Sequence, residues 1–488
     1  MTVRVLHVAA ELYPLLKTGG LADVVGALPP VLAPLGADVR VLMPGFPAVI
    51  AGLDDLRPVA HLGPRFGLHD PTVQFGRMKT NGTGVYVIRA DAFYDRPGSP
   101  YLDSSHHPYA DNDKRFAMLG WVASLMAQGA DASWTPQVVH AHDWHAGLAA
   151  PYIRAAETAQ HRKLAATVMT VHNLAYQGLF AASAFHELGL PWSYYQMQGM
   201  EFWGQVSYLK AGLFYSDKIT TVSPTYANEI QTLPQGAGLD GLLRERTHDV
   251  IGILNGVDYG VWHPSIDDAI ASKYWVDEMD GKAVCKQALQ KRFGLAERDD
   301  APLFGVVSRL TEQKGLDRLL AAVPEIVARG GQLVVLGTGE PKLESGLKSA
   351  AREHPDAVAI ELGFDETLAH VIIAGSDVVC VPSRFEPCGL TQLYGLAYGT
   401  LPLVHCVGGL ADTVVDASLE NLADGVATGF VFEKFDLASL TLAIKRAFAL
   451  HARRDDWAQT QRHGMTTNFG WEASALRYFD LYQRLVQT

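Results

Sequence analysis

Short apolar runs rich in β-branched residues, separated by helical patterns, are the feature that most constrains how this chain folds. Several runs are apolar throughout rather than alternating, which is typical of parallel strands buried on both faces. The runs are residues 3–10, 37–43, 84–90, 136–140, 167–171, 218–222, 250–254, 303–308, 332–336, 357–361, 377–381, 401–406 and 428–432. Strand–helix alternation of this kind predicts parallel α/β sheets.

The polar stretch 255–282 interrupts this alternation and divides the strands into two sets. So many strands are unusual for one open sheet. We therefore expect two doubly wound domains, residues 1–254 and residues 255–465, each Rossmann-like. Because doubly wound sheets bind ligands beyond the carboxyl ends of their strands, the two domains would face a central cleft lined by both sets of loops.

Charge and composition exclude several classes of partner. Lys and Arg number 40 against 52 Asp and Glu, a net charge of −12, which argues against general affinity for nucleic acid or anionic membranes. No stretch reaches the roughly 18 apolar residues that span a bilayer. The four cysteines form no CxxC pair, which fits a reducing cytosol. We expect a cytoplasmic protein with no nucleic-acid or membrane partner, and we predict no oligomeric state.

A glycine-rich segment, KTGGLADV, follows the first predicted strand. Gly19 and Gly20 let the backbone approach a ligand closely, and exposed N–H groups before a helix suit a phosphate. Lys17 adds a positive charge. The order of residues is neither that of a Walker A loop nor GxGxxG, so a glycine-capped turn with a solvated lysine remains the alternative.

Polar clusters follow two further strands. In HAHDWH, three histidines and Asp143 could hold a metal, but no HxxxH helical pair accompanies them. Polar substrate binding is favoured, with Asp143 and His145 on hydroxyls and Trp144 stacking on a sugar ring; structural hydrogen bonding is the other alternative. After the next strand, His172 and Asn173 also favour a hydroxyl-rich ligand, although a lone histidine there is more often structural.

Two cations, Arg309 and Lys314, flank a loop between a strand and the start of a helix. Paired cations beside a helix N-terminus form an anion site. In a chain of net charge −12 such a local pair is informative, although a surface arginine and lysine on a loop are the simpler interpretation.

The segment PSRFEPCGLT follows the buried run 377–381. Backbone N–H groups of Gly389, Leu390 and Thr391 would point at a pyrophosphate. Glu386 is placed to accept hydrogen bonds from sugar hydroxyls. Cys388 could be a thiol nucleophile, but no partner base is evident, so a close-packed loop residue is favoured.

Six motifs, in this order and spacing, resemble bacterial glycogen synthases and plant starch synthases over essentially the whole chain: KTGGLADVVGALP, HAHDWHAGL, TVHNLAYQG, LNGVD, SRLTEQKGLD and PSRFEPCGLTQLYGLAYGT. The resemblance implies a GT-B glycosyltransferase fold whose final helix, in residues 466–488, crosses back to the N-terminal domain. It also implies transfer of glucose from ADP-glucose to the non-reducing 4-hydroxyl of an α-1,4-glucan such as glycogen, with retention of the α-anomer. No cofactor is implied, and no metal, because no DxD motif is present.

The resemblance also assigns residues. The catalytic residues that it implies are His172, Arg309, Lys314, Glu386 and Asp143. The substrate-binding residues that it implies are Lys17, Gly19, Gly20, Tyr101, Trp144, His145, Asn173, Asn255, Phe364, Cys388, Gly389, Leu390 and Thr391. In this scheme the main-chain carbonyl of His172 stabilises positive charge at the anomeric carbon, and Phe364 lies at the adenine pocket. Related retaining transferases carry a second glutamate where this chain has Tyr394, which leaves the ribose contact unassigned.

Three alternatives stand beside this interpretation. A non-catalytic glucan-binding protein could share the scaffold, although the presence of Lys17, Arg309, Lys314 and Glu386 argues against it. A nucleotide-sugar epimerase would need no glucan. A phosphorylase-like enzyme would need a pyridoxal-phosphate lysine motif, and none matches.

Overall fold

The computed structural model describes residues 2–487, and its chain divides into two compact units. Unit 1 runs to Leu254 and also contains the segment from Trp471, whereas unit 2 is Asn255–Gly470. The predicted boundary near residue 466 lies at the end of helix α19 (Arg454–Thr466), and the helix that belongs to unit 1 begins at Trp471.

Unit 1 is built on a nine-stranded sheet of order β12-β11-β7-β6-β1-β2-β5-β4-β3. Its strands are β1 (Val3–Val8), β2 (Ala37–Pro44), β3 (Leu53–His61), β4 (Thr72–Met78), β5 (Gly84–Arg89), β6 (Val138–His142), β7 (Ala166–Val171), β11 (Lys218–Thr221) and β12 (Val250–Gly252). The pairs from β12 to β5 are parallel, as the apolar runs predict.

The antiparallel edge of this sheet was not predicted. Strands β3 and β4 pair antiparallel with each other, and β4 pairs antiparallel with β5. Most residues of β3 are exposed, and β4 mixes buried, half-buried and exposed positions, so neither shows the continuous apolar run of a buried strand. A second small sheet, of β8 (Leu179–Ala181), β9 (Glu201–Phe202) and β10 (Gln205–Ser207), was missed for the same reason.

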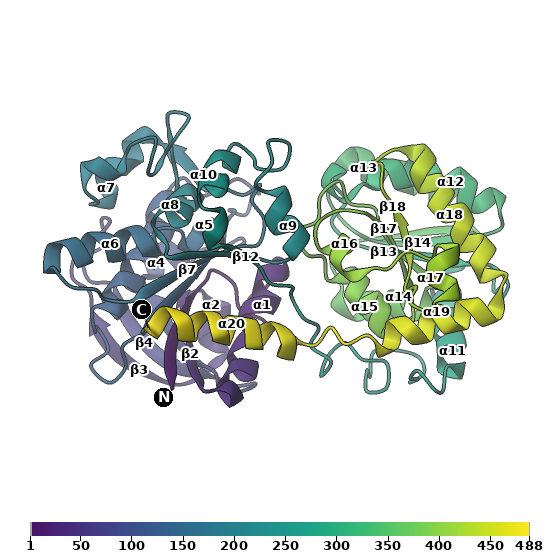
Figure 1. Ribbon diagram of the computed structural model, residues 1–488, viewed down its shortest axis with the longest axis horizontal. Coiled ribbons are helices and arrows are strands. Elements are labelled where there is room, and N and C mark those ends of the chain that lie inside the picture. The colour runs from purple at the N-terminus through teal and green to yellow at the C-terminus, as the bar shows by residue number, and fades with distance from the viewer. Residues whose placement is uncertain (1, 488) are drawn as a thin grey trace. The chain divides into compact units, whose positions relative to one another are not determined.

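Helices cover the large sheet of unit 1 (Figure 1). They are α1 (Gly20–Leu32), α2 (Pro47–Ala51), α3 (Asp91–Tyr94), α4 (Asn112–Ala127), α5 (Asp143–Ala146), α6 (Ala149–Gln160), α7 (Phe185–Leu188), α8 (Tyr208–Tyr215), α9 (Pro224–Glu229), α10 (Asp240–Glu245) and α20 (Trp471–Gln487). On one face α1 and α20 share an apolar cluster with alternate residues of the strands, including Val5, Val138 and Val168. The C-terminal helix is therefore part of the core of unit 1.

Unit 2 is built on a six-stranded parallel sheet of order β15-β14-β13-β16-β17-β18. Its strands are β13 (Leu303–Val307), β14 (Gln332–Gly337), β15 (Val358–Leu362), β16 (Val378–Val381), β17 (Leu401–His405) and β18 (Phe430–Phe432). Its helices are α11 (Asp280–Phe293), α12 (Leu316–Ala328), α13 (Pro341–Glu353), α14 (Glu366–Gly375), α15 (Thr391–Ala397), α16 (Gly408–Thr413), α17 (Leu419–Ala423), α18 (Leu437–His451) and α19. Apolar clusters form on both faces of the sheet, so its strands are buried on both sides as predicted.

Candidate active site

The loop after β1 is organised by Glu11, a buried carboxylate that is 4% exposed. It accepts hydrogen bonds from the backbone N–H groups of Thr18 (2.6 Å) and Gly19 (3.1 Å), and from the hydroxyl groups of Thr18 and Tyr101. The predicted glycine segment is therefore held by a carboxylate in its own unit, and Gly20 opens helix α1 directly after it.

Lys17, on the same loop, forms an ion pair with Asp23 in the first turn of α1, at 2.9 Å. Its ammonium group also lies 5.1 Å from the centroid of the Tyr13 ring. The lysine is therefore held by an ion pair within its own loop rather than fully solvated.

Strand β6 ends at His142, and the next residue, Asp143, has a positive φ of 54°. This uncommon backbone conformation turns the chain sharply into α5. The ring of His145 stacks on that of Tyr101 at 4.6 Å between centroids. Trp144 packs against Phe116 at 4.9 Å, edge to face. The HAHDWH segment and Tyr101 thus form one aromatic and polar cluster.

Asp143 braces the loop that follows β7. Its Oδ1 accepts a 2.7 Å hydrogen bond from the backbone N–H of His172, and the backbone of Asn173 also donates to this carboxylate. Burial raises the pKa of Asp143 to about 7, despite these donors. Burial lowers the pKa of both His145 and His172 to about 3, so both rings are neutral at pH 7.

A buried group of histidines lies beneath this cluster. The nitrogens of His7, His140 and His142 that could bind a metal lie within 4.8 Å of one another. However, all six ring nitrogens take part in hydrogen bonds, to one another, to Tyr482, to Thr170 and to His172. A metal would have to break several of these bonds, so the residues fit a hydrogen-bonded core better than a metal centre.

In unit 2, two of the predicted residues form an ion pair in which the carboxylate is buried and the lysine is half-buried. Lys314, after β13, donates to Oε2 of Glu386, after β16, at 2.6 Å. Ser383 donates to the same oxygen at 2.8 Å, and Glu386 is 5% exposed. Arg309, on the same loop as Lys314, is exposed.

The 386–391 segment is close-packed on one side and opens into the seven-residue helix α15. The backbone N–H of Gly409 donates to the carbonyl groups of Glu386 (3.2 Å) and Pro387 (3.1 Å). Gly408, with a φ of +44°, lies so close that an added Cβ would meet the Glu386 carbonyl oxygen at 1.9 Å. The Gly-Gly pair after β17 therefore sets the path of the predicted donor loop.

Cys388 lies within this loop and is buried, and burial raises the pKa of its thiol to about 12. The backbone of Asn255, the first residue of unit 2, hydrogen-bonds to this thiol, which brings two predicted binding residues together. Phe364 stands apart from them on the loop after β15, where it is 79% exposed.

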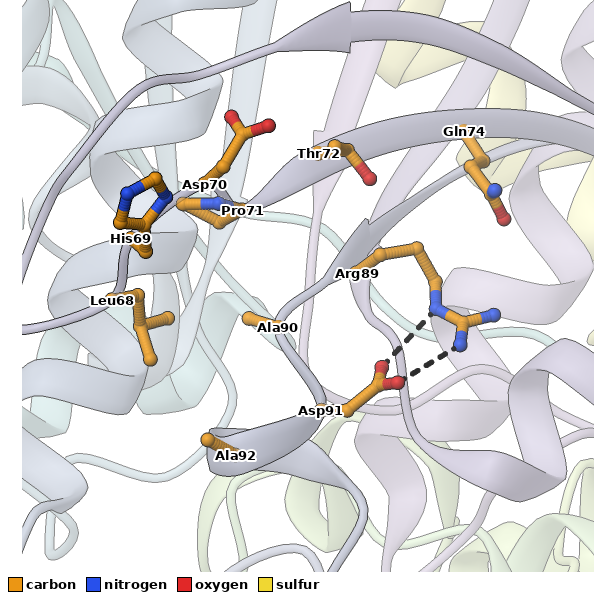
Figure 2. Close-up of a pocket in the computed structure, with 10 residues that line it drawn as sticks. All are labelled: Leu68, His69, Asp70, Pro71, Thr72, Gln74, Arg89, Ala90, Asp91 and Ala92. Atoms are coloured by element: carbon orange, nitrogen blue, oxygen red, sulfur yellow. Dashed lines mark hydrogen bonds and ion pairs between the residues drawn. The ribbon is translucent and has the colours of Figure 1, made fainter.

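A cavity of about 480 Å³ lies elsewhere in unit 1, between β4, β5 and α3 (Figure 2). It is lined by Leu68, His69, Asp70, Pro71, Thr72, Gln74, Arg89, Ala90, Asp91 and Ala92. Arg89 and Asp91 of this lining form two 3.2 Å hydrogen bonds with each other, and the sequence predicted no site residue here.

Comparison with known proteins decides the family. The family model described as starch synthase catalytic domain matches residues 4–245, and that of glycosyl transferases group 1 matches residues 288–464. The glycogen synthase of Francisella tularensis subsp. novicida (strain U112) is 56% identical over 486 residues, which covers 99% of each chain. This chain belongs to the glycogen synthase family. As a member of that family it is a glycosyltransferase, and the resemblance predicted from its six motifs is confirmed.

Solved structures support the assignment to the glycogen synthase family. The catalytic domain of starch synthase IV from Arabidopsis thaliana, solved with ADP and acarbose bound, has a TM-score of 0.90 and 30% identity, with 100% of both chains covered. A sucrose-phosphate synthase from Thermosynechococcus elongatus, with a TM-score of 0.59 and 18% identity over 99% of both chains, shares the fold. The predicted fold class, two doubly wound α/β domains of GT-B type, is confirmed.

Sequence reasoning missed three residues that shape this glycogen synthase site. Glu11 closes the first apolar run, but a single carboxylate after a strand carries no distinctive pattern. Gly408 belongs to a Gly-Gly pair after a predicted strand, which is a visible pattern that could have been used. Tyr482 lies on α20, far along the chain from the histidines that it contacts.

Proposed function

We propose that the protein transfers glucose from ADP-glucose to the non-reducing 4-hydroxyl of an α-1,4-glucan, with retention of the α-anomer. The observation that carries this proposal is the ion pair of half-buried Lys314 with buried Glu386, after β13 and β16, with Arg309 on the same loop as Lys314, in a glycogen synthase family member. ADP as the donor nucleotide is supported by the Arabidopsis starch synthase IV structure, which was solved with ADP.

In unit 2 the proposed roles divide between charge and hydroxyl recognition. Arg309 and Lys314 offset the negative charge that grows on the diphosphate as it leaves. Glu386 accepts hydrogen bonds from glucose hydroxyls through Oε1, because Oε2 is bound to Lys314 and Ser383. Backbone groups from Cys388 to Thr391 line the sugar and phosphates, Asn255 lies near the donor, and Phe364 lies at the adenine pocket.

In unit 1 we assign the sugar-facing roles. The main-chain carbonyl of His172 stabilises positive charge at the anomeric carbon, and Asp143 holds that stretch of backbone through its 2.7 Å bond to the His172 N–H. Tyr101, Trp144, His145 and Asn173 bind glucose or the acceptor glucan. Lys17, Gly19 and Gly20 lie on the loop that meets the donor phosphates.

The proposed mechanism of retention depends on whether a free carboxylate is available as a nucleophile among these residues. Retaining glycosidases use a free carboxylate to form a covalent intermediate. Here Glu386 is held by Lys314 and Ser383, and Asp143 by the backbone of residues 172 and 173. We therefore propose attack on the same face. The C1–O bond to the diphosphate breaks, the acceptor O4 bonds to C1, and the O4 proton passes to the leaving phosphate oxygen.

No metal or cofactor enters this scheme, because the leaving-group charge is met by side-chain cations and backbone donors. None of the helices described in residues 2–487 is long and apolar enough to cross a membrane. A cytoplasmic location remains part of the proposal, consistent with the reduced cysteines expected from the sequence.

The test is a direct assay of purified protein with ADP-glucose and glycogen. ADP release should match glucan growth mole for mole, and UDP-glucose in parallel measures nucleotide preference. A glucan-binding protein would release no ADP, and an epimerase would convert the sugar nucleotide without glycogen. If no nucleotide-glucose supports glucan growth, the proposal is wrong.

A further inference from the structure

A row of buried imidazoles runs through unit 1 and ends on the C-terminal helix. Alternate residues of a strand share a face of the sheet. His7 of β1 is in register with His140 of β6, and His142 of β6 is in register with Thr170 of β7. The side chains lie on the face that α20 covers, because Tyr482 of this helix contacts both His7 and His140.

Four side chains form a continuous hydrogen-bonded series, which we call the imidazole chain. Tyr482 Oη lies 3.2 Å from His7 Nε2, His7 Nδ1 lies 3.1 Å from His142 Nε2, and His142 Nδ1 lies 3.0 Å from His172 Nε2. Tyr482 Oη also lies 2.6 Å from His140 Nδ1, so a side branch anchors the tyrosine. The series connects a helix from the end of the chain to the proposed active-site histidine.

The imidazole chain permits only two arrangements of its protons. Burial lowers the pKa of His7 and His172 to about 3 and holds that of His142 well below its usual value, so all three rings are neutral. A neutral imidazole has one donor and one acceptor nitrogen. The hydrogen bonds must therefore all run in one direction. His172 ends with a proton on Nδ1 if Tyr482 donates to His7, and with a bare Nδ1 if the direction is reversed.

We propose that Tyr482 is a positioning residue for the transferase reaction, which sets the tautomer and ring orientation of His172 through His7 and His142. The inference rests on the proposed function, in which His172 lies beside the donor sugar, and it adds to the main-chain role of His172 a role for its ring and for the C-terminal helix. The single proton of the Tyr482 hydroxyl can serve His7 or His140 but not both, so the hydroxyl ties the direction of the series to the tautomer of His140. Without this hydroxyl, His7 Nε2 loses its partner, that tie is lost, and His172 populates both tautomers. Outer partners of metal-bound histidines act in the same way, and their loss commonly lowers activity by about tenfold or more, so we expect an effect of this size here.

The first test reads the tautomer without using activity. Full-length protein labelled with ¹⁵N-histidine is compared as wild type and as Tyr482→Phe, with the His172 signals identified by their loss in His172→Gln. We expect one set of tautomer-specific nitrogen shifts in the wild type and averaged or doubled shifts in Tyr482→Phe. Tyr152→Phe is the matched control, because it also removes a buried hydroxyl of unit 1, one that donates to the Leu188 carbonyl at 2.7 Å. Unchanged His172 shifts in Tyr482→Phe would overturn the proposal.

The second test is a kinetic cycle. Tyr482→Phe should lower kcat about tenfold with KM for ADP-glucose and glycogen within about twofold, whereas Tyr152→Phe should change neither. If the tyrosine acts through His172, Tyr482→Phe should cause no further loss in a His172→Gln background. An equal loss in that background overturns the proposal. His172→Gln keeps the main-chain carbonyl, so full activity of this variant would show that the His172 ring takes no part in the reaction, which would overturn the proposed effect of Tyr482 on turnover without touching the proposed main-chain role.

Discussion

In both units the candidate site residues lie at the carboxyl ends of parallel strands. Those of unit 1 are mostly neutral, whereas those of unit 2 include charged side chains. In unit 1, burial keeps the histidines neutral and raises the pKa of Asp143 to about 7. In unit 2, half-buried Lys314 and buried Glu386 form an ion pair, and Arg309 lies on the same loop as Lys314. Neutral, hydrogen-bonding groups suit sugar hydroxyls, whereas cations suit a diphosphate. In the proposed scheme the sugar-facing groups therefore lie mostly in unit 1 and the cations that meet the diphosphate mostly in unit 2, with Lys17 of unit 1 as the exception.

Removal of the cations of unit 2 should have the largest effect. Arg309→Ala and Lys314→Ala are each expected to lower kcat by about 10²-fold or more, because each removes charge that stabilises the leaving diphosphate. Steady-state ADP release measures the loss. Lys348→Ala, an exposed lysine on α13, is the control and should retain full activity.

Arg309→Ala and Lys314→Ala should differ in thermal stability. Lys314→Ala also leaves buried Glu386 without its cation, so it should lower the melting temperature, whereas Arg309 is exposed and its variant should melt as the wild type does. Near wild-type turnover in both variants would show that these cations take no part in the reaction. The proposed contrast between a neutral site in unit 1 and a cationic site in unit 2 would then be wrong.

Mildly acidic pH should destabilise unit 1 more than unit 2. In unit 1, burial lowers the pKa of His7, His145 and His172 to about 3, so the unfolded chain takes up protons below pH 6.5 while the folded unit does not. The free energy of unfolding of unit 1 therefore decreases as the pH is lowered, by up to about 2 kcal/mol per histidine between pH 6.5 and pH 5. Asp143, with its pKa raised to about 7, acts in the opposite sense and offsets only part of this loss.

Hydrogen exchange at about pH 7.5 and pH 5, corrected for the intrinsic rate, measures this prediction strand by strand. Protection of β1, β6 and β7 should fall on acidification more than that of β13, β14 and β16. Within residues 2–487, the unit 2 histidines with a lowered pKa are His263 and His451, and they do not form a connected group. Equal loss of protection in both units would contradict the idea that unit 1 depends on neutral imidazoles.

The sequence predicted most of the fold because buried parallel strands are continuous apolar runs. Each of the thirteen predicted runs corresponds to a strand, although their ends differ by up to two residues. The missed strands, such as β3 and β8, are exposed edges whose residues follow no apolar pattern. Edge strands are fixed by pairing with a neighbour, and such pairing leaves little trace in local sequence.

The candidate site shows the same division. Lys314 and Glu386 were predicted because each follows a strand and carries a charge, and the structure brings them to 2.6 Å. Glu11 and Tyr482 were not predicted, because their importance depends on partners that are distant in sequence: Tyr101 for the first and His140 for the second. Tertiary contacts of this kind need the fold before they can be recognised.

The backbone support of the donor loop should have a smaller effect than its charges. Gly408→Ala places a Cβ 1.9 Å from the Glu386 carbonyl oxygen, in a backbone with a φ of +44°. The loop must shift, so we expect roughly tenfold lower kcat and a stability loss of about 1–3 kcal/mol. Gly294→Ala is the matched control: its φ is +66°, but nothing lies within 4 Å of the added Cβ. If both variants lose the same activity, backbone strain rather than contact with the Glu386 loop is responsible.

The smallest effect on kcat is expected at Cys388, which lies in unit 2 near the charged residues but contributes no charge itself. Burial raises the pKa of its thiol to about 12, so at pH 7 it is protonated and cannot act as a thiolate nucleophile. Cys388→Ala should keep kcat within about threefold, since it removes one buried sulfur and no reacting group. Iodoacetamide should modify exposed Cys406 and leave Cys388 intact, with activity retained. A loss above about 10³-fold in Cys388→Ala, or inactivation that tracks alkylation of Cys388, would place the thiol in the reaction and replace same-face attack by a covalent route.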